Sequence, residues 1–126
     1  MVAQFAAVGI GAALGAWLRW GLAAWLNARV PNFPLGTLAA NLIGGYLVGI
    51  AVAVAVTRPD LPPEWRLFII TGFLGGLTTF SSFSAEVTEL LAHGDYASGL
   101  LLAAAHLAGS LLLTAAGFAT VRLLGS

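Results

Sequence analysis

The chain has no cysteine and no lysine, and charged side chains of either sign are scarce. Without cysteine, a disulfide scaffold, a thiolate metal site and thiol redox chemistry are all excluded. Of the 126 residues, 60% are hydrophobic and 8% are charged. Average soluble domains carry about 25% charged residues, which they need to cover their surface. The composition therefore predicts that lipid surrounds most of the chain.

No charge of one sign dominates, because the five cations, all arginine, balance five acidic residues. Nucleic acids and acidic partners require a basic face, so this balance argues against both. The sequence also lacks a His-Glu-x-x-His zinc motif, a pair of aspartates within one predicted helix and a phosphate-binding Gly-x-x-x-x-Gly-Lys-Ser/Thr loop. We therefore expect no enzyme activity.

Four apolar stretches are long enough to cross the hydrocarbon core, which takes about 20 helical residues. They run over residues 2–26, 36–56, 67–91 and 96–124. Proline and glycine gather in the short connections between them. No cation precedes the first stretch, so we expect it to be retained and not removed as a signal peptide. The sequence predicts an all-α integral membrane protein with a single transmembrane domain over residues 1–126.

Small residues recur at a spacing that suits close packing of membrane helices. Gly11-x-x-x-Gly15 and Gly45-x-x-x-Gly49 would let helix backbones approach each other. The alternative is that glycine is simply frequent in membrane helices. A four-helix chain buries little around a central site, so we expect an oligomer as the working unit.

The arginines are spread almost evenly over the two sides of the predicted bundle. Arg58, Arg66 and Arg122 fall on the side of the termini, whereas Arg19 and Arg29 lie toward the other. The Lys/Arg difference between the sides sets the orientation of a membrane protein. A nearly equal distribution predicts insertion in both orientations, which is dual topology.

The third apolar stretch contains an irregular segment from Thr71 to Ser84, T-G-F-L-G-G-L-T-T-F-S-S-F-S. Gly72, Gly75 and Gly76 weaken a helix, so we expect a polar, glycine-rich break here. Unwound backbone at membrane depth must be sheltered by protein or water. In transporters, free carbonyls at such breaks bind small cations and half-helix N-termini favour anions. The alternative is a continuous helix with glycines packed on a neighbour and hydroxyls bonded to earlier carbonyls.

Phe80 and Phe83 are three residues apart and so share one helix face among serines. An aromatic ring has a positive edge, which could hold a poorly hydrated anion. Packing in an apolar core is the alternative for two phenylalanines at this spacing.

Several further polar side chains lie within the predicted spans. Asn41 would form either an interhelical hydrogen bond or a donor in a pore. Arg19 is either functional or extends to the interface, since charge inside a membrane is costly. Glu86 and Glu89 lie toward the end of the third span, where they could take part at a pore mouth.

His106, Ser110 and Thr114 recur every four residues and form one polar stripe. Such a stripe indicates either a solvated path along the helix or a set of interhelical hydrogen bonds.

These residues closely resemble the Fluc (CrcB) family of fluoride channels over essentially the whole chain. The resemblance rests on residues 15–20 (GAWLRW), 36–42 (GTLAANL) and, above all, 71–84. It implies an antiparallel, dual-topology homodimer with two fluoride pores along the subunit interface. It also implies passive fluoride export across the cell (inner) membrane, which protects against fluoride toxicity.

The resemblance further implies roles for individual pore residues. Phe80 and Phe83 would line the pores with ring edges toward fluoride. Asn41 would donate a hydrogen bond near them. Ser110 and Thr114 match a polar track opposite the phenylalanines.

A structural, non-transported Na⁺ at the dimer axis is also implied by the resemblance and is required for activity in the family. The backbone carbonyls of Gly75 and Thr78 from both subunits would hold it, and Arg19 matches a residue of the aqueous vestibule. A fixed buried cation lowers the cost of bringing an anion into the membrane.

Two other functions compete with the channel. A proton-coupled small multidrug exporter is similar in size but needs a titratable carboxylate inside the bilayer. The first span here has no Asp or Glu and carries Arg19 instead. The second competitor is a non-conducting assembly subunit that uses its glycine motifs only for packing.

Overall fold

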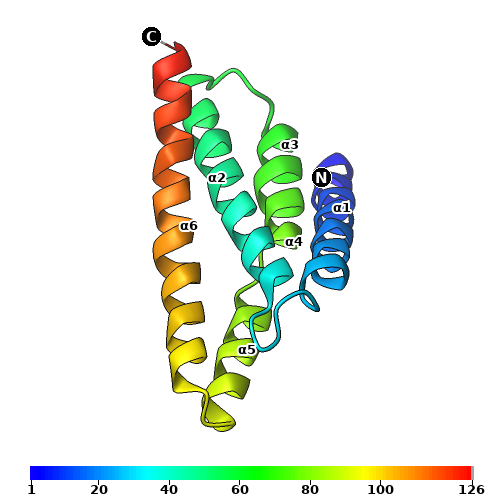
Figure 1. Ribbon diagram of the computed structural model, residues 1–126. Coiled ribbons are helices and arrows are strands. Elements are labelled where there is room, and N and C mark those ends of the chain that lie inside the picture. Colours follow the sequence, from blue (N-terminus) through cyan, green and yellow to red (C-terminus); the bar gives the residue numbers. More distant parts are fainter. Residues whose placement is uncertain (126) are drawn as a thin grey trace.

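The computed structural model describes residues 1–125, which form helices joined by short connections (Figure 1). The helices are α1 (Val2–Leu26), α2 (Leu35–Thr57), α3 (Pro63–Arg66), the π-helix η1 (Leu67–Leu74), α4 (Gly75–Leu77), α5 (Phe80–Ala92) and α6 (Tyr96–Gly125). Four helical segments in this part of the chain are long and apolar enough to cross a membrane: α1, α2, the run Pro63–Ala92 and α6. The all-helical, four-span prediction is confirmed.

The segments form a layered bundle in which α1 and α6 lie on opposite sides (Figure 1). The run from α3 to α4 packs along α1, and α2 packs along most of α6. After the break, α5 leaves α1 and packs on α6 instead. The third segment therefore changes its neighbours halfway along its length.

Few side chains are buried in a single protomer, and most of those are small. The buried hydrophobic residues are Ala40, Ala51, Ala53, Leu74, Leu77 and Leu102. Large apolar side chains such as Trp17 and Trp20 point outward instead. Because lipid tails are as apolar as these side chains, the bundle depends on close packing of helices and on hydrogen bonds between them.

Glycines bring α1 into backbone contact with the third segment. A β-carbon on Gly15 would collide with the backbone of Phe73 and come within 2.7 Å of the Leu77 nitrogen. A β-carbon on Gly76 would collide with the backbone of Ala12. The two helix backbones therefore touch with no side chain between them.

Glycines also join α2 to α6. A β-carbon on Gly45 would lie 3.0 Å from the Ser110 carbonyl oxygen, and one on Gly49 would collide with the Thr114 backbone. The predicted packing role is thus confirmed for both glycine motifs.

The break in the third segment is confirmed, but the prediction that glycines cause it was wrong in part. Gly72 lies in the π-helix, and Gly75 and Gly76 are α-helical. The chain becomes extended only at Thr78 (φ −87°, ψ 154°) and Thr79 (φ −149°, ψ 123°). Two threonines form the break, because Gly72 and Gly76 are held in helical geometry by their contacts with α1.

The competing interpretation of the third segment is also partly right. Gly72 and Gly76 pack on a neighbouring helix, as that interpretation expected. The Thr78 hydroxyl donates to the Leu74 carbonyl four residues earlier, at 2.8 Å. The third segment therefore contains glycines that pack on α1 and, directly after them, the break.

We predict that Gly15→Ala destabilises the protein, whereas Gly9→Ala does not. A methyl group at residue 15 must push α1 away from the third segment, and such overpacking costs roughly 1–3 kcal/mol. A β-carbon on Gly9 would have no neighbouring atom within 4 Å. The thermal unfolding midpoint in detergent checks the difference. Equal midpoints for the two variants would contradict backbone contact at Gly15.

Candidate functional site

A cavity of about 430 Å³ lies beside the break and opens on the protomer surface. We call it the break groove. Its walls come from α2, the third segment and α6, three segments that are distant in sequence. Of the residues to which the family resemblance gives a role, it gathers all except Arg19: Asn41, Gly75, Thr78, Phe80, Phe83, Ser110 and Thr114. His106 also lines it.

The side-chain amide of Asn41 holds the extended backbone of the break. Its Nδ2 donates to the Thr79 carbonyl at 2.9 Å, and its Oδ1 accepts from the Thr79 nitrogen at 2.8 Å. The amide thus replaces the helical acceptor that the Thr79 nitrogen loses at the break and adds a second donor to the Thr79 carbonyl, which caps α5. Of the two roles predicted for Asn41, the interhelical hydrogen bond is present in this structure.

His106 supports that amide from α6. Its Nδ1 lies 2.9 Å from Asn41 Nδ2. Because Asn41 Oδ1 faces the Thr79 nitrogen, Nδ2 is the donor here and Nδ1 accepts. In the neutral ring the proton is therefore on Nε2. His106 is 4% exposed, and its Nε2 has no partner among residues 1–125.

The two phenylalanines follow the break in the first turn of α5. Their ring centroids are 5.4 Å apart with an interplanar angle of 79°, an edge-to-face contact. Phe83 also stacks on His106, with 4.3 Å between ring centroids. Phe80 is 79% exposed at the side of the groove. The alternative for these two phenylalanines, packing in an apolar core, fits Phe83 better than Phe80.

Two carbonyls at the break lose their helical donors. In a continuous helix, Gly75 O would accept from the Thr79 nitrogen, but that nitrogen donates to Asn41. Thr78 O would accept from the Ser82 nitrogen, which instead donates to the Thr79 hydroxyl at 3.1 Å. Both carbonyls belong to residues that line the groove. Each of these two carbonyls therefore lacks the donor that a continuous helix would supply.

The hydroxyls on α6 are already bonded to backbone. Ser110 Oγ donates to the Leu107 carbonyl at 3.2 Å. Thr114 Oγ1 lies 2.8 Å from the Gly45 carbonyl on α2 and 2.8 Å from the Ser110 carbonyl. The stripe therefore includes an interhelical hydrogen bond and also faces the groove.

Arg19 does not line the break groove. Its Nε donates instead to the Gly76 carbonyl at 3.0 Å, across the contact between α1 and α4. The structure thus places Arg19 beside the break from α1, whereas Asn41 reaches the break from α2. The vestibule position stays a prediction.

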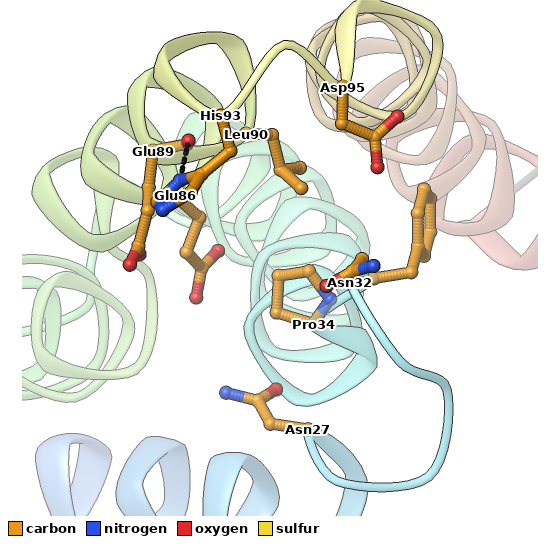
Figure 2. A pocket seen from close by; sticks show the side chains of 9 residues that line it. Asn27, Asn32, Pro34, Glu86, Glu89, Leu90, His93 and Asp95 are labelled. Atoms are coloured by element: carbon orange, nitrogen blue, oxygen red, sulfur yellow. Dashed lines mark hydrogen bonds between the residues drawn. The ribbon is translucent and has the colours of Figure 1, made fainter.

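A second cavity of about 620 Å³ lies near the connection between α5 and α6 (Figure 2). Its lining includes Glu86, Glu89, His93 and Asp95, and the His93 ring contacts the Glu89 carbonyl. Glu86 is one helical turn beyond Phe83 on α5. The second cavity therefore lies farther along α5 than the break groove does.

Thr37 and Glu86 form a contact between these two regions that the sequence did not indicate. The Thr37 hydroxyl donates to Glu86 Oε2 at 2.6 Å, and Thr37 is 3% exposed. Thr37 lies one turn before Asn41 on α2. The sequence did not indicate the Asn41–His106 contact either. The feature that could have pointed to it is the presence of a polar residue within each of the apolar helices α2 and α6.

Comparison with known proteins gives the chain a family. Residues 6–118 match the family described as "CrcB-like protein, Camphor Resistance (CrcB)". The "Fluoride-specific ion channel FluC" of Ralstonia nicotianae is 64% identical over 121 residues, which cover 96% of each chain. The protein of that name from Pseudomonas putida is 58% identical over 120 residues, covering 95% of this chain and 94% of the relative. The resemblance that residues 71–84 indicated is thus confirmed, and the chain belongs to the CrcB family.

Proposed function

We propose that this chain is a fluoride channel that lets fluoride leave the cell passively. The observation that carries the proposal is the break groove, which gathers two phenylalanines, the Asn41 amide and the α6 hydroxyls of Ser110 and Thr114 beside unwound backbone. Close relatives that bear the name of fluoride-specific channels support the choice of ion. The chain would act in the cell (inner) membrane as a multi-pass protein.

A second copy of the chain would complete the groove. Phe80 and Gly75 are exposed on the protomer, although both line the groove. In a membrane these polar and aromatic walls would face lipid unless another surface covered them. A homodimer provides such a surface. The nearly equal distribution of arginine supports an antiparallel pair with dual topology.

The groove offers fluoride partial replacements for its hydration water. Phe80 and Phe83 bring ring hydrogens, which are the positive part of an aromatic ring. They also lie at the N-terminus of α5, where the unpaired N–H groups and the helix dipole favour an anion. Channel filters use such groups in place of water around a permeating ion.

Asn41 needs a rearrangement before it can donate to fluoride. Both of its amide hydrogens are engaged, one with the Thr79 carbonyl and one with His106. The contact with His106 is the one that an anion could replace without loosening the break. We therefore place fluoride, at this level of the pore, near His106 and Phe83.

The free carbonyls of Gly75 and Thr78 fit a small cation, and we propose that they hold a structural Na⁺. The diversion of the Thr79 and Ser82 nitrogens to side chains supports this assignment. Two carbonyls from one protomer are a partial shell, so the second copy would contribute the same pair. Bound Na⁺ would supply a fixed positive charge beside the anion path.

We predict that the purified protein releases fluoride from liposomes, and that Phe80→Ile or Phe83→Ile lowers this flux at least tenfold. Isoleucine keeps the apolar volume but has no polarised ring edge. Phe5→Ile is the matched control, because Phe5 lies on α1, outside the groove, and is 83% exposed. A fluoride electrode measures the flux, and size-exclusion chromatography checks that the dimer is intact.

Two outcomes of this experiment would count against the proposal. No fluoride flux from the folded wild-type protein would leave a packing subunit as the better description. Normal flux in both phenylalanine variants would leave the channel intact but make these rings packing residues.

We predict that replacing Na⁺ by N-methyl-D-glucamine during purification abolishes flux and lowers the thermal unfolding midpoint. A ligand that binds only the folded state stabilises it by about 2.7 kcal/mol at one hundred times its Kd. Titration with NaCl should restore the midpoint, and choline chloride at the same ionic strength should not. A midpoint that rises equally with both salts would contradict a Na⁺ site.

We predict that single cysteines at Val30 and Asp60 are each labelled from both sides of the membrane. The chain has no cysteine of its own, so each introduced thiol is a clean probe. Val30 lies between α1 and α2, and Asp60 lies between α2 and α3. An impermeant maleimide should therefore modify about half of each variant from outside intact cells. Complete labelling of one position and none of the other would rule out dual topology.

A further inference from the structure

Arg19 lies on the same face of α1 as the glycines that contact the third segment. Gly11, Gly15 and Arg19 are spaced four residues apart, which aligns them along one side of a helix. The opposing face carries Gly72 and Gly76 at the same spacing. The glycine contacts therefore bring the Arg19 side chain to the end of α4.

The carbonyl that Arg19 meets has been left open by the break. In a continuous helix, Gly76 O would accept from the nitrogen of Phe80, but α4 ends at Leu77 and α5 starts at Phe80. Arg19 Nε donates to this carbonyl at 3.0 Å. Of the carbonyls in the last turn before the break, Gly76 O thus has a donor from α1, whereas the adjacent Gly75 O loses its donor to Asn41.

We propose that Arg19 is a positioning residue whose Nε–H group, and not its charge, fixes the last turn of α4. With Gly76 O bonded toward α1, the neighbouring carbonyl of Gly75 is held on the groove side. The inference rests on the proposed function, because it assigns Arg19 the task of ordering the carbonyls for Na⁺. It differs from a vestibule role, in which the positive charge attracts the anion.

Three substitutions separate the donor from the charge. Arg19→Gln keeps an N–H donor at the same distance along the side chain as Nε but removes the charge. Arg19→Lys keeps the charge but puts a methylene group at that position. Arg19→Met removes both. Arg29 is the matched control, because its Nε donates to the Trp25 carbonyl at 3.3 Å, in an exposed position away from the break.

The first readout is Na⁺ binding, measured as the shift of the thermal unfolding midpoint in detergent with NaCl against choline chloride. We expect Arg19→Gln to keep the apparent Kd for Na⁺ within about threefold of the wild-type value. Arg19→Lys and Arg19→Met should weaken it roughly tenfold, the upper end of the effect of losing one neutral hydrogen bond. Arg29→Gln and Arg29→Lys should both leave it unchanged. Fluoride efflux from liposomes at several Na⁺ concentrations is the second readout and should rank the variants in the same order.

The inference is overturned if Arg19→Lys matches the wild type while Arg19→Gln is weakened, because charge would then be the requirement. It is also overturned if all three variants bind Na⁺ normally, or if Arg19→Gln fails to fold. Should Arg19→Lys and Arg19→Met fail to assemble while Arg19→Gln is stable, the donor is essential and the inference holds.

The experiment also distinguishes this inference from the proposed function. A wild-type protein that binds Na⁺ but passes no fluoride would refute the channel, and the Na⁺ titrations would still decide the role of Arg19. A wild-type protein that passes fluoride but shows no Na⁺ response would refute the Na⁺ site and the inference together.

Discussion

The bond between the Asn41 amide and the Thr79 backbone is the interaction on which the rest of the structure depends. Lipid offers no hydrogen bonds, so two residues of extended backbone at membrane depth need protein partners. Asn41 gives Thr79 a donor and an acceptor, and the Thr79 hydroxyl caps the start of α5. With these groups satisfied, the helix can stop and restart. The carbonyls that remain are then available for other chemistry.

Close packing makes these bonds possible. The α1 backbone touches the third segment through glycines, and α2 touches α6 in the same way. Short distances between backbones allow single side chains such as Arg19 and Thr114 to reach carbonyls on neighbouring helices. These glycines contribute little buried apolar volume to the protomer, but they bring its polar groups together.

The sequence predicted the four spans and the membership of the groove well, because hydropathy and the block 71–84 are local signals. It misplaced the break by attributing it to glycine. Gly72 and Gly76 weaken an isolated helix, but here contacts with α1 hold them helical. The partners of Arg19 and His106 were also not predictable, since each lies more than fifty residues away in the chain. Such contacts depend on how helices pack, which no local pattern encodes.

The π-helical stretch Leu67–Leu74 has a consequence for how this chain can vary. Its bonds span five residues instead of four, so it accommodates a residue that a regular α-helix would not. Removing one residue there would return the stretch to a regular α-helix and leave the following residues on nearly the same faces. The same deletion in the α-helical turn Gly75–Leu77 would move the break relative to α1, because each residue of an α-helix turns by about 100°. The third segment should therefore tolerate a change of length in its π-helical stretch far better than one beside the break.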